Sequence, residues 1–138
     1  MKSDHVAKAS TKIQASGDDV WKALTDPKAI KQYMFGADVA SDWRVGSRIT
    51  WSGEFQGKPY KDTGQVLEAV RGSRLVYSHA SGGKADAVHT VTIDLAGAGN
   101  ETQVLLTQDN NPDEDSRKHA EKNWATMLDG LRKYVEGH

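Results

Sequence analysis

The C-terminal stretch NNPDEDSRKHAEKNWATMLDGLRKYVEGH (residues 110–138) decides the fold. It predicts a helix with Asn111 as N-cap and Pro112 at the first helical position, followed by acidic residues that the helix dipole favours. Apolar residues then recur at spacings of three and four, which gives one apolar stripe on a helix of about six turns. The members of this stripe are Ala120, Trp124, Met127, Leu128, Leu131 and Val135.

The chain from Gly36 to Gln108 keeps no helical period and is divided by glycine-containing turns. The turns read VGS, QGKP, RGS, SGGK and AGAGN, which is typical of a meander of six strands. A further strand is predicted within residues 5–15. An antiparallel sheet of this size needs a cover for its apolar face, and the C-terminal helix is the predicted cover, so the fold class is α+β.

Two short helices are predicted between the first strand and the meander. Ser16 is the expected N-cap of the first, with Asp19 three residues later in a capping-box arrangement. Asp26 is the expected cap of the second, with Pro27 at its first position and an end before Gly36.

The bulk composition narrows the function classes. The chain has 138 residues, which predicts a single domain over 1–138, and 18 basic against 19 acidic residues. This balance disfavours nucleic acid as a partner. The absence of cysteine excludes disulfides, thiolate nucleophiles and cysteine-bound zinc. Neither a signal peptide nor an apolar run of ~20 residues is present, so we expect a cytoplasmic protein without membrane insertion.

The turn centres predict which residues share the inner face of the sheet, because a slip of one residue moves every side chain to the other face. The expected rows become more polar along the strands, and the QGK turn adds Trp51 and Asp62 at the polar end. A sheet that is dry at one end and amphipathic at the other predicts a small-molecule pocket under the helix. The rows are Val70, Leu75, Ile93 and Val104, then Glu68, Tyr77, Val91 and Leu106, then Val66, His79, His89 and Gln108.

Four segments resemble a known family. VWKALTDPKAIKQYM, DWRVGSRITWSGEF, GQVLEAVRGSRLVYSH and NWATMLDGLRKYVEG are similar to relatives of the C-terminal domain of the heat-shock protein 90 ATPase activator, within the START/SRPBCC superfamily. The resemblance covers residues 7–135. It implies a helix-grip fold, in which a curved sheet of about seven strands wraps around a long C-terminal helix. It also implies a function among carriers, cyclases and chaperone-linked stress-response proteins.

The paired histidines of the YSHASGGKADAVHT stretch, His79 and His89, carry the most specific chemistry. Cross-strand neighbours have Cβ atoms ~5 Å apart, so both rings could reach one metal ion. A metal needs a third ligand, for which Glu68 or Asp62 would be the nearest, and no H-x-H spacing supports one. We therefore predict no metal and no cofactor, and interpret the pair as polar cavity lining, with general acid/base work as the alternative.

The leading hypothesis is a binding protein for a small hydrophobic or aromatic molecule, serving transport, sensing or sequestration. One alternative is a cyclase-type enzyme that uses His79 or His89 as acid or base, and another is a module that interacts with a chaperone or other protein through its outer surface. A plain packed core is the competing interpretation of the aromatic residues. The predicted ligand-binding residues are Met34, Phe35, Trp51, Asp62, Glu68, Tyr77, His79, His89, Gln108, Trp124, Met127 and Leu131.

Overall fold

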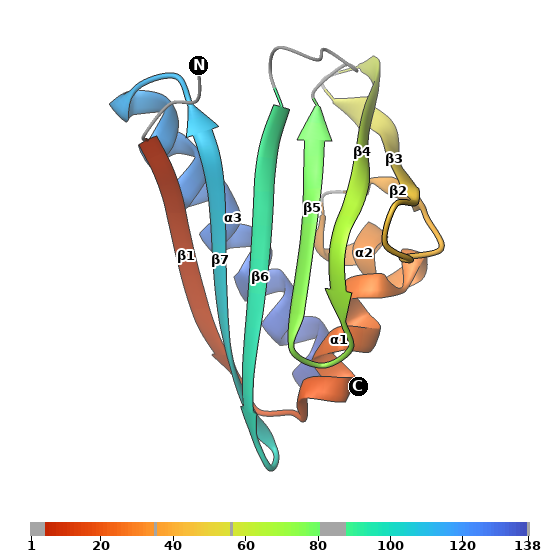
Figure 1. The fold of residues 1–138 in the computed structure, drawn as a ribbon, viewed down its shortest axis with the longest axis vertical. Helices are drawn as coiled ribbons and strands as arrows, with labels where there is room; N and C mark the ends of the chain where they lie inside the picture. Colours follow the sequence, from red (N-terminus) through yellow and green to blue (C-terminus); the bar gives the residue numbers. More distant parts are fainter. Residues whose placement is uncertain (1–4, 35, 56, 81–87, 138) are drawn as a thin grey trace.

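Seven antiparallel strands form one curved sheet around a long C-terminal helix, and two short helices follow the first strand (Figure 1). The computed structural model describes residues 5–34, 36–55, 57–80 and 88–137. The predicted helix-grip α+β fold is confirmed. Its elements are β1 (His5–Ile13), α1 (Gly17–Thr25), α2 (Pro27–Tyr33), β2 (Asp38–Ala40), β3 (Arg48–Phe55), β4 (Lys58–Val70), β5 (Arg74–Ala80), β6 (Val88–Ala98), β7 (Glu101–Asn111) and α3 (Glu114–Glu136).

Strands β2 to β7 form a meander, in which each strand pairs with the next along the chain, and β1 adds to it at one edge. The strand order is β1-β7-β6-β5-β4-β3-β2, so β1 lies beside the last strand and β2 forms the opposite edge. The helix α3 crosses one face of this sheet diagonally, and α1 and α2 lie next to its C-terminal half (Figure 1). None of the helices in the described ranges combines the length and the apolar composition that a membrane crossing needs.

The start of α3 differs from the predicted one. Asp113 is the N-cap, and its carboxylate accepts a hydrogen bond from the backbone N–H of Ser116 at 2.8 Å. Asn111 instead ends β7, where its buried Nδ2 donates to the carbonyl oxygens of His5 and Gln108, each at 3.1 Å. Asn111 therefore ties the last strand to the first, and the acidic residue two positions later caps the helix.

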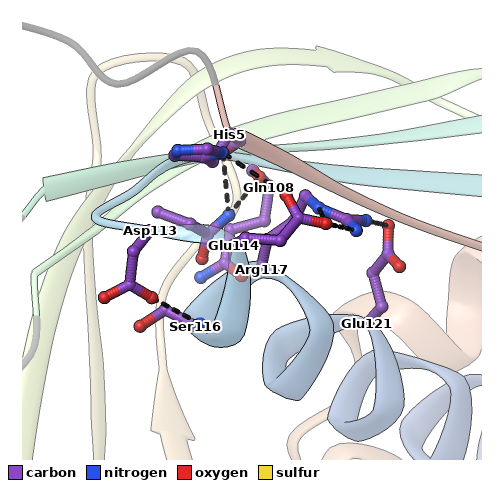
Figure 2. A network of polar contacts seen from close by, with 8 residues as sticks. His5, Gln108, Asp113, Glu114, Ser116, Arg117 and Glu121 are labelled. Carbon is purple, nitrogen blue, oxygen red and sulfur yellow. Dashed lines mark hydrogen bonds and ion pairs between the residues drawn. The ribbon is translucent and has the colours of Figure 1, made fainter.

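A polar network joins the beginning of α3 to β1 (Figure 2). The Nδ1 atom of His5 lies 3.6 Å from a carboxylate oxygen of Glu114, and Arg117 contacts both Glu114 and Glu121. The Glu121 carboxylate also accepts from the backbone N–H of Lys8 at 3.0 Å. Exposed ion pairs of this kind contribute little stability individually, so the network orients the helix more than it stabilises it.

Both short helices begin as predicted. The Ser16 hydroxyl accepts from the backbone N–H of Asp19 at 3.2 Å, and the Asp26 carboxylate accepts from that of Lys28 at 3.1 Å. Pro27 occupies the start of α2. These caps fix the two helices at the lower end of the sheet, where they contact α3.

The buried core begins at this lower end and extends along the sheet as far as Trp51 and Tyr77. Gly130 of α3 allows close approach of α2, because an added Cβ would lie only 3.3 Å from Cβ of Tyr33. Helix α3 contributes Leu128 and Leu131, both fully buried. The other side chains at most 2% exposed come from the sheet and the short helices and include Ile13, Val20, Ile30, Leu75, Ile93 and Leu106.

The predicted register is correct for one hairpin and shifted by two residues in two others. His79 pairs with His89, as predicted. Val91 pairs with Gln108 rather than with Leu106, since the centre of the β6–β7 turn lies one residue later than expected, which shifts each pairing by two. Trp51 pairs with Asp62 rather than with Gly64. A shift of two keeps each side chain on its predicted face, so these errors move residues along the sheet only.

The β4–β5 register is wrong by one residue near the turn, which changes the face. A three-residue turn with Gly72 at φ +76° pairs Val70 with Arg74 and Glu68 with Val76. Glu68 therefore lies on the outer face, where its carboxylate is 3.5 Å from Nε of Arg74, and Val70 is 48% exposed. A bulge between Val66 and Glu68 restores the predicted face, so Val66 is buried as expected.

Candidate functional site

Two adjoining cavities lie between the inner face of the sheet and the N-terminal half of α3. Their volumes are about 590 Å³ and about 610 Å³, and both are in the range of small-molecule sites. Four residues line both cavities: Met34, Gln108, Asn123 and Trp124. We call the cavity that continues along α3 from Met127 to Asp115 the helix cavity, and the one that extends to β3, β4 and β5 the strand cavity.

A hydrogen bond between α3 and β7 stands where the two cavities meet. The indole Nε1–H of Trp124 donates to Oε1 of Gln108 at 2.8 Å. Gln108 is only 9% exposed, so its amide depends on such partners rather than on bulk water. The pair fixes the indole ring and divides the space under the helix into two parts.

Aromatic side chains form the wall of the strand cavity. Trp51 of β3 packs against Tyr77 of β5 with ring centroids 5.5 Å apart, and against the ring of His79 edge-on at 4.9 Å. Tyr60 of β4 lines the same cavity. Burial raises the pKa of Tyr77 well above its usual range, so its hydroxyl stays neutral and can act as a hydrogen-bonding group. Apolar ring faces with a few polar atoms are typical of ligand sites.

The polar end of the strand cavity contains a hydrogen-bonded histidine and aspartate. Nε2 of His79 lies 3.0 Å from Oδ2 of Asp62, and the two side chains are 23% and 20% exposed. Burial lowers the pKa of His79 below its ordinary value of 6.5; the Asp62 carboxylate acts in the opposite direction, and His89 adds to the lowering. The imidazole is therefore neutral at neutral pH. Since a carboxylate only accepts, Nε2–H donates to Asp62 and Nδ1 is left as an acceptor.

The second histidine has a different environment. His89 pairs with His79 across the β5–β6 hairpin, so it shares the inner face. Its Nδ1–H donates to the carbonyl oxygen of Asp109 at 2.8 Å, and the Asp109 carboxylate accepts from the backbone N–H of Thr90 at 2.6 Å. His89 lines neither cavity. The two histidines meet as predicted, but only His79 reaches the cavity.

The structure places eight of the twelve predicted site residues on the two cavities, whereas Leu131, Glu68 and His89 line neither of them. Leu131 is fully buried in the core, one helical turn beyond Met127. Glu68 lies on the outer face because of the register error described above. Phe35 lies outside the described residues. The eight that line the two cavities are Met34, Trp51, Asp62, Tyr77, His79, Gln108, Trp124 and Met127.

Polar residues of α3 also line the helix cavity and were not predicted. They continue the apolar stripe of Trp124 and Met127 toward the N-terminus at the same spacing of three and four. The helical period alone could have placed them on the inner face, although their polarity is typical of a solvated surface. They are Asp115, Ser116, His119 and Asn123.

The described residues offer no group of three or more histidine, aspartate or glutamate side chains arranged to hold a metal ion. His79 and Asp62 form a pair without a third ligand, and zinc sites in proteins need at least three. The chemistry available here is therefore hydrogen bonding, stacking and proton exchange at a neutral imidazole.

A curved antiparallel sheet that grips a long helix over such a cavity defines a helix-grip protein of the START/SRPBCC class. The family described as "Activator of Hsp90 ATPase homolog 1-like protein" matches residues 14–136, and the chain belongs to this family. A search of curated protein sequences found no match.

Solved structures agree with this assignment. The solution structure of ChR145 from Cytophaga hutchinsonii is 45% identical, with a TM-score of 0.84 over 99% of this chain and 97% of that one. The Aha1 dimer from Colwellia psychrerythraea is 23% identical, with a TM-score of 0.77 over 95% and 96%. CalU16 from Micromonospora echinospora is 21% identical, with a TM-score of 0.71 over 98% and 85%. The latter two share the fold at low identity.

Proposed function

We propose that this protein binds a small molecule with an apolar or aromatic body in the two adjoining cavities. The observation that carries the proposal is the pair of cavities of about 600 Å³ each beneath α3, with aromatic walls and a hydrogen-bonded polar end. Membership of the family supports a protein with a ligand or a protein partner. Transport, sensing or sequestration in the cytoplasm would each use such a site.

The proposed roles follow from the chemistry of each side chain. Trp51, Tyr77 and Trp124 would hold the apolar body of the ligand between their rings. His79 would accept a hydrogen bond at Nδ1 or present its ring edge, while Asp62 keeps the ring in one tautomer. Gln108 would contribute the part of its amide that Trp124 does not engage. His89 would act only as the cross-strand neighbour of His79.

General acid/base catalysis is the second candidate, and the His79–Asp62 hydrogen bond favours it. A neutral imidazole held by a carboxylate at 3.0 Å can take a proton from a bound substrate, as in a cyclase-type reaction. His79→Ala separates the two functions. A binding protein should lose part of its affinity, whereas an enzyme should lose turnover and keep most of its affinity.

Native mass spectrometry of the purified protein tests the proposal first, by detecting a retained small molecule. Chemical-shift mapping then locates the bound molecule through the indole N–H signals. We expect Trp51 and Trp124 to shift and Trp21 of α1, which lines neither cavity, to stay in place. Shifts confined to residues of the outer face, such as Glu68 and Arg74, would contradict the proposal.

A chaperone or other protein partner would leave a different signature. Such a partner would bind the outer surface and would be insensitive to substitutions in the cavity. Pull-down with the wild type and with Trp124→Ala checks this. Equal recovery of a partner with both proteins, together with no small molecule in the cavity, would favour a protein-interaction module.

A further inference from the structure

Within the described part of the chain, the carboxylates are the formally charged side chains that line the two cavities, and His79 and His119 are the two lining residues that can take up a positive charge. Asp62 lines the strand cavity from its interior, the exposed Glu54 lines the same cavity, and Asp115 lines the helix cavity. Among the described residues that line either cavity, lysine and arginine are absent. A carboxylate or phosphate ligand would therefore meet like charge and, among the described lining residues, would find no lysine or arginine to bind it.

The excess of acidic side chains is a property of the cavity lining and not of the whole chain, which is close to neutral with 18 basic and 19 acidic residues. Two of its arginines illustrate where the cations lie. Arg74 lies between Glu68 and Asp94 on the outer face of the sheet. Arg132 contacts Asp129 on the surface of α3. The chain thus contains many cations, but none of the lysines and arginines among its described residues lines either cavity.

The histidine at the polar end does not supply a positive charge either. Burial lowers the pKa of His79, so the ring is neutral at neutral pH. Its contact with Asp62 is a hydrogen bond from a neutral donor and leaves the negative charge of the carboxylate in place. A carboxylate accepts several hydrogen bonds, so Asp62 can hold His79 and still receive a donor from a ligand.

Aromatic rings line the same cavity as two of these carboxylates. Trp51, Tyr60, Tyr77 and Trp124 all line the strand cavity together with Glu54 and Asp62. The face of an aromatic ring attracts a cation within ~6 Å, most strongly for tryptophan. Carboxylates and ring faces are the two kinds of group that bind an organic ammonium ion, and the strand cavity combines them.

We propose that the strand cavity selects ligands with an organic ammonium group attached to an apolar or aromatic body, and that it discriminates against carboxylates and phosphates. This inference rests on the proposed binding function and specifies its ligand class. The ammonium group would lie toward Asp62 and Glu54, and the apolar body would lie against Trp51 and Trp124.

Three probes with the same ring and different charges test the proposal. They are 2-phenylethylammonium, 2-phenylethanol and phenylacetate, titrated into the full chain while the indole N–H signals are followed. We expect the ammonium probe to bind at least about tenfold more tightly than phenylacetate, a difference of about 1.4 kcal/mol, with the alcohol between them. Asp62→Asn and Glu54→Gln should each reduce this ratio.

Glu68→Gln is the matched control, because it removes a carboxylate from the outer face and should leave the ratio unchanged. The two-dimensional amide spectrum of each variant verifies that it is folded. If phenylacetate binds as tightly as the ammonium probe, or if the ratio survives in both cavity variants, the ligand class is wrong while the binding function stands. If none of the probes shifts Trp51 or Trp124, the binding function fails and the inference fails with it.

Discussion

The two halves of α3 lie over the same sheet but have opposite environments. The C-terminal half places Leu128 and Leu131 in a core that excludes solvent, closed by α1 and α2. The N-terminal half places Asn123 and Trp124 over two cavities of about 600 Å³. The same apolar stripe of α3 thus packs into the core at one end and lines the cavities at the other. The difference comes from what packs beside the helix, because the two short helices lie next to its C-terminal half (Figure 1).

Truncation of a core residue is expected to have the largest effect on stability. We call the region around the C-terminal half of α3 the closed half and the region around its N-terminal half the open half. Leu131→Ala removes a fully buried side chain from the closed half and should lower the free energy of unfolding by about 2–5 kcal/mol. Asn123→Ala changes an exposed residue two turns earlier and should stay within about 0.5 kcal/mol. Urea unfolding measures both. Equal losses in the two variants would show that the halves do not differ as described.

Gly64→Ala is expected to disturb both the sheet and the cavity. An added Cβ would lie 1.9 Å from the backbone carbonyl oxygen of Ser78 and 3.1 Å from the Trp51 ring. Because backbone atoms cannot rotate away, β4 and β5 must separate, at a cost of about 1–3 kcal/mol. Thermal unfolding and the indole signal of Trp51 follow the two effects. A variant with wild-type stability would mean that the close pairing of these strands is wrong.

Loss of the hydrogen bond between Trp124 and Gln108, which lies where the two cavities meet, is expected to have a moderate effect on stability. Trp124→Phe keeps an aromatic ring but removes the donor to Gln108, and should cost about 1 kcal/mol. Trp43→Phe is the control, since within the described part of the chain the buried Nε1–H of Trp43 meets no acceptor. The control should lose only packing. A larger loss in the control than in Trp124→Phe would contradict the role of this bond.

The pH dependence of stability is expected to show the smallest effect. The pKa of His79 is lower in the folded chain than its ordinary value of 6.5, so the unfolded chain binds this proton first as the pH falls. The contribution of the neutral His79 ring to the free energy of unfolding is therefore fully present above about pH 6.5. It declines as the pH falls from there toward the pKa of His79 in the folded chain. Chemical denaturation between about pH 7.5 and pH 5.5 should show this decline in the wild type and not in His79→Gln.

Asp62→Asn tests the contribution of Asp62 to the same pH dependence. The Asp62 carboxylate raises the pKa of His79, in opposition to burial, so its removal should lower that pKa further and extend the decline to more acidic pH. A smaller decline in Asp62→Asn than in the wild type would show that Asp62 does not stabilise the protonated ring.

The closed half could be predicted from the sequence more completely than the open half. The period of α3 and the caps Ser16 and Asp26 depend on local chemistry, and the structure has them as expected. The position of the N-cap at Asp113 rather than Asn111 could not be predicted, because the Asn111 side chain is used by a contact with His5 at the other end of the chain.

The sheet shows where turn chemistry limits such predictions. The hairpin that pairs His79 with His89 was assigned correctly. Glu68 was assigned to the wrong face because the RGS turn has three residues with Gly72 in the left-handed region, which changes the parity of the pairing, and a bulge then restores it. The residue inside this bulge, Leu67, is an ordinary strand residue, so the local sequence does not mark the irregularity.

The candidate site was predicted in outline from the pairing of inner-face residues, which indicated Trp51, Asp62, Tyr77 and His79 as neighbours. The polar residues of α3 that complete the helix cavity were missed, because polar residues on a helix usually face water. Whether such residues face solvent or a cavity depends on how far the strands curve away from the helix, and that distance is a property of the whole sheet.

A crystal structure of the protein with 2-phenylethylammonium tests the central claim most directly, namely that the upper half of the sheet–helix interface is a ligand cavity. The account predicts the phenyl ring against Trp51 and Trp124, with the ammonium group toward Asp62 and Glu54. Side chains of the protein filling this space, with the probe only on the outer face of the sheet, would contradict it.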